Sequence, residues 1–509
     1  MFVSVKSATL HGVDALEIDV EVDFTQKANP AFTMVGLAEG AVREARERVL
    51  AAVRSSMHRL PAARITVNLA PADRRKAGSG FDLPLALGLL AGAGIIPPER
   101  LEGLLCAGEL SLAGELRAVT GILPMAVLAR DQKMRALMVP AGNGQEAAMV
   151  DGLTVYGPRT LNEAVAIIMG DEAAIAPVVA DVWTDNEVYS GLDFIDVKGQ
   201  EHGKRAIEIA AAGAHNLLFI GPPGSGKTML AQRIPSVLPH LTPDESLEVT
   251  KIYSVAGLLE GGAALMRERP FRSPHHTVSE AGLVGGGTRP RPGEVSLAHR
   301  GVLFLDELPE FNKSALEVLR QPLEDSVVTI SRAIQTLTYP ANCMLVAAMN
   351  PCPCGYRTDD RHTCICTTTQ IQRYRSRLSG PLLDRIDLHI EVPAVPWEDL
   401  RSARSGTSSA TMRERVMAAR ARQSARYAGT NITTNAELTG SMLEKHCALG
   451  TTEHDFLERA VKVLALSARA YTRIIRIART IADLEAADNI SVEHLAEAVN
   501  CRTLDREHF

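Results

Sequence analysis

The segment LLFIGPPGSGKT, residues 217–228, contains the residue types that hold a nucleoside triphosphate. An apolar run leads into a glycine-rich turn, and glycines let the backbone fold round a phosphate with its N–H groups pointing inward. Lys227 can reach the terminal phosphates, and the Thr228 hydroxyl can bind Mg²⁺. A glycine-rich turn without a function is the alternative, but strand, loop and helix stand in the order that a phosphate loop requires. The candidate nucleotide-binding residues are Gly221, Pro222, Pro223, Gly224, Ser225, Gly226, Lys227 and Thr228.

A second apolar run, Val302 to Leu305, ends in two acids, Asp306 and Glu307. Asp306 is placed to hold Mg²⁺ through water, and Glu307 to polarise the water that attacks the terminal phosphate. The alternative is that the two acids only begin a surface turn.

A third apolar run, MLVAAMN, ends in Asn350. Ligands gather at the carboxyl ends of parallel strands, so Asn350 is predicted to orient the water or to sense the γ-phosphate.

Arg385 lies between Asp384 and Asp387, just before a predicted strand that begins at Asp387. If subunits form a ring, this arginine can enter the neighbouring site and neutralise charge in the transition state. A local salt bridge is the competing interpretation.

Three arginines, Arg469, Arg473 and Arg476, recur at helical spacing near the carboxyl end. A different face of the same helix carries apolar residues, so one face is expected to pack and the other to be basic. A solvated charge stripe explains the pattern, but a helical lid over a nucleotide also needs a cation. Arg469, near the helix start, is the candidate.

Four cysteines, Cys352, Cys354, Cys364 and Cys366, lie within fifteen residues directly after Asn350. Four thiolates suit tetrahedral Zn²⁺, and a bound ion could hold a small loop that has little core of its own. Reduced, unliganded thiols are the alternative, since the CxC spacing is tighter than CxxC, and His362 is a possible substitute ligand.

The segment QRYRSRLSG follows the cysteines and gathers Arg373, Arg375 and Arg377 with Tyr374. This group is a candidate contact for the phosphates of DNA.

The composition fits a multidomain globular protein. The chain has 509 residues, of which 46% are hydrophobic and 22% charged, and a formal net charge of −6. These values indicate neither disorder nor a fibrous repeat, and the net charge neither supports nor excludes DNA binding. The start lacks a secretory pattern, and the longest apolar run, Leu83 to Ile96, is too short to cross a bilayer, which predicts a cytoplasmic protein without disulfides.

The pattern along the chain predicts an α/β protein with three domains and two linkers. Mixed α/β patterns occupy residues 1–170 and 192–400, and the second contains the four-cysteine insertion at 352–366. Residues 171–191 and the serine-rich 401–410 are expected to be linkers, and residues 411–509 are expected to be helical.

The order of these motifs resembles that of an AAA+ P-loop ATPase. The phosphate loop comes first and is followed by the acidic strand end, the strand that ends in Asn350, Arg385 and the helical lid. The stretches FRSPHHTVSEAGLVGGGTRPRPGEVSLAHRGVLFLDELPEF and EDSVVTISRAIQTLTYPANCMLVAAMNPCPCGY resemble the magnesium-chelatase-like AAA+ proteins of the ComM (YifB) type, and the resemblance extends over nearly the whole chain. It implies Walker A at 221–228, Walker B at Asp306 and Glu307, sensor 1 at Asn350, the arginine finger at Arg385 and sensor 2 at Arg469.

The resemblance also implies an activity. The family implies a homo-hexameric ring that hydrolyses ATP with Mg²⁺, and ComM implies a helicase that drives branch migration of single-stranded or branched DNA during natural transformation. A motor subunit like that of magnesium chelatase, which remodels a protein partner, is the alternative. No membrane association is expected.

Two inserted elements of such rings lie at the central channel. One is the segment around His275, His276 and the glycines 285–287, where the two histidines could instead suggest a metal. The other is a β-hairpin predicted for SVVTISRAIQTLTY, where Arg332 near the turn is either a DNA contact or an ordinary exposed arginine.

The amino-terminal segment resembles the carboxyl-terminal domains of Lon protease and RadA through KAGSGFDLPLAL and GELSLAGELRAVTGILP. Leu123 occupies the position of the lysine that activates the Lon serine, so Ser79 would be a weak nucleophile and proteolysis is disfavoured. The domain is expected to serve ring assembly or DNA contact, with Lys76, Arg74 and Arg75 as a small basic patch.

Overall fold

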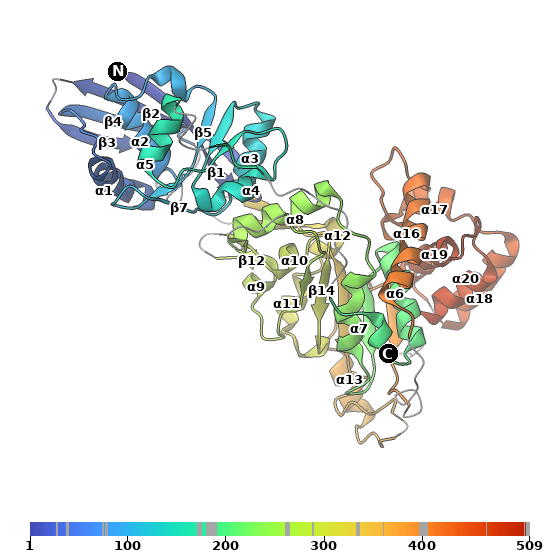
Figure 1. Ribbon diagram of the computed structural model, residues 1–509. Coiled ribbons are helices and arrows are strands. Elements are labelled where there is room, and N and C mark those ends of the chain that lie inside the picture. Colours follow the sequence, from blue (N-terminus) through green and yellow to red (C-terminus); the bar gives the residue numbers. More distant parts are fainter. Residues whose placement is uncertain are drawn as a thin grey trace. The chain divides into compact units, whose positions relative to one another are not determined.

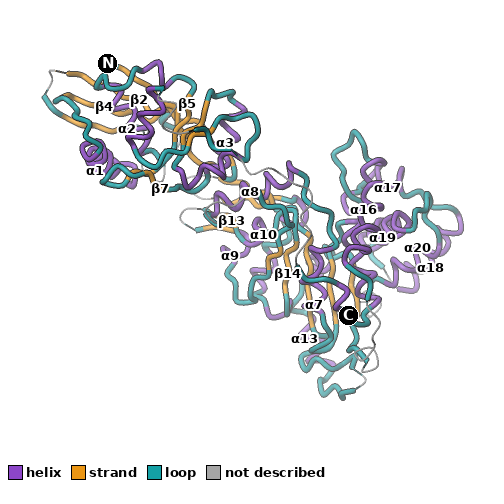
Figure 2. The backbone as a smooth tube through the Cα atoms, viewed as in Figure 1, coloured by secondary structure: helices purple, strands orange, loops and turns teal. Residues whose placement is uncertain are grey.

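The structure is a computed structural model in which the chain folds as two compact units (Figures 1 and 2). It describes residues 1–26, 29–36, 40–73, 76, 80–170, 176–179, 191–259, 265–287, 290–331, 336–359, 361–396, 406–464, 466–502 and 504. The first unit comprises Met1–Asn186, Pro243–Met266 and Ala333–Thr338, and the second comprises the remainder of the chain.

The first unit is built on a seven-stranded mixed sheet in the order β3-β4-β2-β1-β5-β8-β9. Strands β1, β2 and β4 pair antiparallel, whereas the other neighbours are parallel. The strands are β1 (Phe2–His11), β2 (Asp14–Gln26), β3 (Ala31–Val35), β4 (Ala63–Ala70), β5 (Leu104–Cys106), β8 (Ala136–Met138) and β9 (Val155–Tyr156), with a small separate pair β6 (Glu109–Leu110) and β7 (Leu116–Arg117). Its helices are α1 (Gly40–Ser55), α2 (Asp82–Gly92), α3 (Ile122–Asp131), α4 (Gly144–Ala148), α5 (Leu161–Met169) and α8 (Pro243–Ala256), with 3₁₀ turns η1 (Pro98–Leu101) and η2 (Ala141–Asn143).

Two hydrophobic cores cover the faces of this sheet. Successive side chains of a strand point to opposite faces, and accordingly Leu104 and Cys106 pack in the core that contains α1, α2 and α5, whereas Leu105 packs in the core that contains α3 and α4. Every residue of α2 is buried, which explains why the apolar run that begins at Leu83 is hydrophobic all round.

The second unit is built on a five-stranded, wholly parallel sheet in the order β11-β14-β17-β10-β18. Every residue of β10, β14 and β17 is buried, as expected for a parallel sheet covered on both faces. The strands are β10 (Leu217–Ile220), β11 (Phe271–Arg272), β14 (Val302–Leu305), β17 (Met344–Met349) and β18 (Leu388–Glu391), and the short strands β12 (Gly285–Gly286), β13 (Arg291–Pro292), β15 (Val327–Ser331) and β16 (Thr336–Pro340) form two further pairs. The helices before the last linker are α6 (Glu201–Gly213), α7 (Lys227–Arg233), α9 (Glu280–Val284), α10 (Glu294–Leu297), α11 (Lys313–Glu317), α12 (Pro322–Asp325), α13 (Thr368–Arg375) and α14 (Gly380–Leu383), with η3 (Phe194–Asp196), η4 (Ile234–Ser236) and η5 (Leu308–Glu310).

The described elements from residue 406 onward are all helical. They are α16 (Ser409–Arg426), η6 (Asn435–Glu437), α17 (Gly440–His446), α18 (Thr451–Leu464), α19 (Ala468–Leu484) and α20 (Val492–Asn500). The apolar face predicted for α19 is buried in one core with α6, α16 and the sheet.

The predicted fold class is confirmed, because a parallel α/β sheet precedes a helical carboxyl-terminal part. The pairing of β15 with β16 matches the predicted hairpin, but Arg332 lies outside the described residues. The domain boundaries remain a prediction. No helix among the described residues combines the length and hydropathy that a membrane span needs.

One expectation for the first unit is wrong. Lys76 does not contribute to an exposed basic patch, because its side chain is fully buried and its Nζ donates to the carbonyl of Pro71. A buried ammonium needs oxygen partners, and residue type alone does not reveal such a partner. Arg74, Arg75 and Ser79 lie outside the described residues.

Candidate functional site

The phosphate loop connects β10 to α7, and two of its glycines meet requirements that other residues cannot. A Cβ on Gly221 would lie 2.1 Å from the carbonyl oxygen of Val392, and Gly226 has φ +92°, in the left-handed region. Helix α7 begins directly after Gly226, so its amino-terminal N–H groups open onto the loop. This is the strand, loop and helix arrangement that the sequence predicts.

Lys227 joins the loop to the third strand. Its Nζ donates to the carbonyls of Gly221 (2.8 Å) and Pro222 (2.9 Å) and to Asn350 Oδ1 (3.3 Å). Burial lowers the pKa of the Lys227 ammonium, and the charge of Asp306 opposes that effect. The structure therefore brings the predicted Walker A lysine, the Walker B aspartate and the sensor asparagine together.

The residues predicted to hold Mg²⁺ are adjacent. Thr228 Oγ1 donates to Asp306 Oδ2 at 2.7 Å. A hydroxyl and a carboxylate are oxygen ligands of the kind that Mg²⁺ prefers, so the pair fits an ion bound together with the phosphates of ATP.

Glu307 follows Asp306 in a strained conformation. Its φ of +51° is unusual for a residue with a side chain, and its N–H donates to Asp306 Oδ1 at 2.9 Å. The carboxylate is 59% exposed, and Oε2 lies 3.5 Å from Nδ1 of His276. The contact with His276 was not anticipated, because the two residues are 31 positions apart and no sequence pattern joins them.

The cysteine loop begins two residues after Asn350 and returns to the phosphate loop. Gly355, with φ +87°, lies so close to Pro223 that an added Cβ would be 2.7 Å from the proline Cδ. The loop therefore rests on the nucleotide site, a contact that motif spacing alone does not reveal.

The four cysteine sulfurs have the spacing that a tetrahedral metal needs. All four lie within 4.8 Å of one another, with Sγ–Sγ distances of 3.3 Å (Cys352 to Cys354), 3.7 Å (Cys352 to Cys364) and 3.6 Å (Cys354 to Cys364). Zinc–sulfur bonds of about 2.3 Å in a tetrahedron would separate the sulfurs by about 3.8 Å. The N–H of Cys354 also donates to Cys366 Sγ at 3.4 Å. The set fits zinc.

The thiols differ in acidity. Burial raises the pKa of Cys352 to about 12, whereas a backbone hydrogen bond from Tyr356 is the main cause that lowers the pKa of Cys354 to about 6. His362 does not join the sulfurs, since its Nδ1 lies 2.9 Å from Asp359 Oδ2. The described residues contain no other group of three or more His, Cys, Asp or Glu side chains that could hold a metal, so the metal interpretation of His275 and His276 finds no support.

Arg385 forms neither of the local salt bridges considered for it. It pairs with Glu324 and donates to the Pro381 carbonyl at 2.8 Å. Its neighbours pair with the carboxyl-terminal helices instead, Asp384 with Arg469 (3.0 Å) and Asp387 with Arg473 (3.3 Å).

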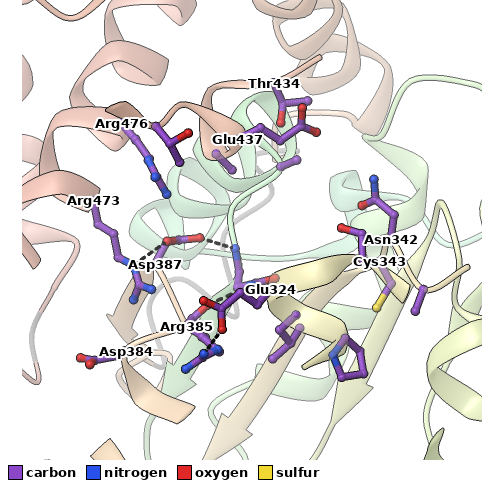
Figure 3. A pocket seen from close by; sticks show the side chains of 18 of the residues that line it. Glu324, Asn342, Cys343, Asp384, Arg385, Asp387, Thr434, Glu437, Arg473 and Arg476 are labelled. Carbon is purple, nitrogen blue, oxygen red and sulfur yellow. Dashed lines mark hydrogen bonds and ion pairs between the residues drawn. The ribbon is translucent and has the colours of Figure 1, made fainter. Parts of the chain in front are cut away.

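These residues surround one cavity (Figure 3). Arg385, Arg469, Arg473 and Arg476 all line it, as do Glu324, Asp384, Asp387 and Glu437. None of its lining residues belongs to the phosphate loop or to the Walker B pair. The cavity is therefore separate from the phosphate loop of the same chain.

The arginine face of α19, formed by Arg469, Arg473 and Arg476, is only partly exposed to solvent. Arg469 is 68% exposed, whereas burial lowers the pKa of Arg473 and of Arg476. Burial alone would raise the pKa of Asp387, but the nearby His215, whose Nδ1 lies 3.7 Å from Asp387 Oδ2, the charge of Arg473 and a hydrogen bond from the backbone N–H of Asn216 hold it well below its usual value.

The predicted DNA contacts are not equivalent. Arg373 is exposed and Arg375 is half-buried, whereas Arg377 pairs with Glu310 at 2.8 Å. Tyr374 is buried, and burial raises its pKa to about 12, so the expectation that it joins the arginines at DNA is wrong. It is the buried residue of α13, whose other residues are at least partly exposed.

Leu123 is fully buried, at the start of α3. Its N–H donates to Glu146 Oε1 at 3.0 Å. An apolar, buried side chain supplies no base at the position that the Lon resemblance assigns to lysine.

Comparison with known proteins places the chain in a family. Signatures described as "Magnesium chelatase, subunit ChlI", "Subunit ChlI of Mg-chelatase" and "Magnesium chelatase, subunit ChlI C-terminal" match residues 193–400, 20–143 and 406–502. Competence protein ComM of Haemophilus influenzae is 45% identical over 502 residues, which cover 97% of this chain and 96% of ComM. The chain belongs to the magnesium-chelatase-like AAA+ proteins of the ComM and YifB type. YifB of Salmonella typhimurium is 44% identical over 496 residues, covering 97% and 96% of the two chains.

The likeness to Lon is partial. Lon protease 2 of Bacillus subtilis is 31% identical over 150 residues, 28% of this chain and 26% of the protease. The similarity to ComM and YifB thus extends over nearly the whole chain, whereas the similarity to Lon protease 2 extends over only a part of it.

We predict that Gly355→Ala weakens nucleotide binding. The new Cβ would strain a left-handed residue and displace Pro223 of the phosphate loop, and overpacking of about 1–3 kcal/mol corresponds to a loss of about 5- to 150-fold in affinity. Titration with a fluorescent ATP analogue measures the effect. Gly429→Ala is the matched control, because Gly429 has φ +80° and no atom within 4 Å of its added Cβ. Equal affinities for the two variants would contradict the prediction.

Proposed function

We propose that the protein is an ATP-hydrolysing motor that assembles as a homo-hexameric ring and acts on single-stranded or branched DNA, as a branch-migration helicase of the ComM type. The observation that supports the proposal is the contact of Lys227 with Asn350 and of Thr228 with Asp306, in a chain that matches ComM over nearly its full length. ATP and Mg²⁺ are its cofactors. Glu307 is the general base and Asn350 positions the water.

The separation of the two arginine-bearing elements from the phosphate loop supports the proposed ring. Arg385 and Arg469 line one cavity, and that cavity includes no residue of their own phosphate loop. A cation stabilises the transition state only when it reaches the transferred phosphate. The two arginines therefore serve the nucleotide of a neighbouring subunit, Arg385 as the finger and Arg469 as sensor 2.

DNA is the favoured substrate because the full-length relative is named for competence. The exposed Arg373, on the helix that follows the cysteine loop, is the first candidate for a phosphate contact, with Arg375, Arg377 and Arg332 as further candidates. The rival function is a chelatase-type motor that remodels a protein partner, and the chelatase signatures support it. The response of the ATPase to DNA separates the two.

A structural zinc ion completes the proposal. Cys352, Cys354, Cys364 and Cys366 would hold it, and it would brace the loop that packs on the phosphate loop.

We expect DNA to stimulate ATP hydrolysis by the purified protein. Rates should be compared without DNA and with single-stranded, duplex and four-way-junction DNA, and the stimulation should fall steeply as salt rises because the contacts are to phosphates. Glu307→Gln should bind ATP but not turn it over, since it loses the general base. An ATPase that is indifferent to all three DNA forms would favour the chelatase-type motor.

Mixed rings test the action of Arg385 across subunits. Arg385→Ala and Lys227→Ala should each be inactive alone, but a random equimolar mixture should recover about one quarter of the wild-type ATPase, because one interface in four pairs an intact site with an intact finger. Co-purification of one untagged variant with the other, tagged variant should first establish that mixed rings form. Continued inactivity in such rings would place the arginine in its own subunit's reaction.

Metal analysis tests the zinc site. The protein as purified should contain about one zinc per chain, and Cys364→Ser should lose it and unfold at a lower temperature, because the loop loses its brace. Cys447→Ser is the control, since Cys447 is buried in the helical part away from the cluster. Reduced protein with no zinc and four titratable thiols would support the alternative of unliganded cysteines.

A further inference from the structure

Asn216 lies at the edge of the five-stranded sheet that is opposite to the phosphate loop. It directly precedes β10, whereas the phosphate loop begins with Gly221, directly after that strand. Strand β18 runs parallel to β10, with Leu217 in register with Leu388, so the chain that enters β18 lies beside Asn216. Arg385 belongs to this entering chain. The strand pair therefore places Asn216 and Arg385 at one edge of the sheet and the phosphate loop of the same chain at the other.

The side-chain amide of Asn216 connects Arg385 to the middle of the sheet. Its Nδ2 donates to the carbonyl oxygen of Arg385 at 2.9 Å, and its Oδ1 accepts from the N–H of Leu345, in β17, at 2.8 Å. One planar group thus supplies a donor to Arg385 and an acceptor to a strand whose residues are all buried. The amide therefore holds the backbone of Arg385 at a fixed distance from β17.

The backbone of Asn216 holds the residues that follow Arg385. Its N–H donates to Asp387 Oδ2 at 3.0 Å, and its carbonyl oxygen accepts from the N–H groups of Asp387 and Leu388, both at 3.0 Å. Asp387 in turn pairs with Arg473 of α19 (Figure 3). Asn216 is therefore bonded to three of the four residues in the segment 385–388.

The guanidinium of Arg385 has contacts of a different kind. It pairs with Glu324, whose side chain is 66% exposed, and it donates to the carbonyl of Pro381. An arginine finger must exchange such contacts for a phosphate when it acts. The hydrogen bond from Asn216 reaches the backbone carbonyl instead, so it is compatible with both positions of the guanidinium. A fixed backbone lets the side chain meet a phosphate in a reproducible geometry.

We propose that Asn216 is a positioning residue, which holds the backbone of Arg385 in the place from which its guanidinium reaches the nucleotide of the neighbouring subunit. The inference rests on the proposed ring and on the proposed role of Arg385 as the finger. Asn216 acts through Arg385 and not on the nucleotide itself. Its effect on hydrolysis should therefore appear at the site of the next subunit and not at the site of its own chain.

Two substitutions measure the contribution of the amide. Asn216→Ala removes both hydrogen bonds of the side chain, whereas Asn216→Asp keeps an acceptor for the N–H of Leu345 but cannot donate to the carbonyl of Arg385. Each should lower the kcat of the full-length protein about tenfold, because a displaced catalytic group loses rate steeply with distance. The affinity for a fluorescent ATP analogue should stay unchanged, since the phosphate loop lies at the other end of β10. An undiminished kcat in Asn216→Asp would overturn the inference.

Mixed rings show on which subunit Asn216 acts. A random equimolar mixture of Asn216→Ala and Lys227→Ala should recover about one quarter of the wild-type ATPase, because the Lys227→Ala chains supply intact fingers to intact sites. If Asn216 served the site of its own chain, the same mixture would fall to about one twentieth, since half of the sites would be lost and the rest would stay at about one tenth. A mixture of Asn216→Ala with Arg385→Ala should show no recovery, because neither chain has a correctly held finger.

The controls separate this inference from general destabilisation and from the proposed function. Asn68→Ala is the matched control, because Asn68 is also half-buried and donates to Glu21 Oε2 at 2.7 Å, in the other unit. It should leave kcat unchanged, and an equal loss there would assign the effect to destabilisation. If Arg385→Ala and Lys227→Ala fail to complement each other, the proposed finger is wrong and the inference falls with it. If they complement but the Asn216→Ala mixture falls to about one twentieth, only the role of Asn216 is wrong.

Discussion

The carboxyl-terminal edge of the five-stranded parallel sheet is the constraint on which the ATP site depends. Ile220 of β10 pairs with Met349 of β17, so Gly221 and Asn350 are the first residues beyond two strands that end together. Strand β14, on the other side of β17, delivers Asp306 to the same edge. Because Ile220 is in register with Met349, a shift of one residue between these strands would move Asn350 out of line with the phosphate loop. The buried strands therefore fix the positions of Gly221, Asp306 and Asn350 relative to one another.

Elements at the margin of the site connect it to less regular parts of the chain. The cysteine loop follows Asn350 and contacts the phosphate loop through Gly355 and Pro223, and the turn after β11 contacts Glu307 through His276. Both connections involve residues with an unusual backbone or a flexible side chain, since Gly355 and Glu307 have positive φ. Local strain of this kind persists only where the surrounding structure maintains it. A conformational change elsewhere in the chain can therefore affect the ATP site through the cysteine loop and through the turn after β11.

The sequence predicts the residues at the carboxyl-terminal edge of the sheet well, because they follow directly after continuous apolar runs. Buried strands that end in Asp306 and Asn350, and a glycine-rich loop before Lys227, can be recognised from local residue order alone, and their contacts are present in the structure. Burial of individual polar residues cannot be recognised in this way, as Lys76 and Tyr374 demonstrate. Pairings between distant segments, such as Arg385 with Glu324, also escape local patterns, because they depend on how elements pack rather than on propensity.

The carboxyl-terminal helices and the predicted finger behave as one body because buried charges join them. Asp387, which follows Arg385 by two residues, accepts a hydrogen bond from the backbone N–H of Asn216 and pairs with Arg473 of α19. Leaving a buried charge without its partner is costly, so Asp387 and Arg473 cannot separate without a penalty. Any rotation of α19 must therefore carry the segment of Arg385 with it. In a ring, a rotation of the carboxyl-terminal helices would therefore also change the distance between Arg385 and the nucleotide of the neighbouring subunit.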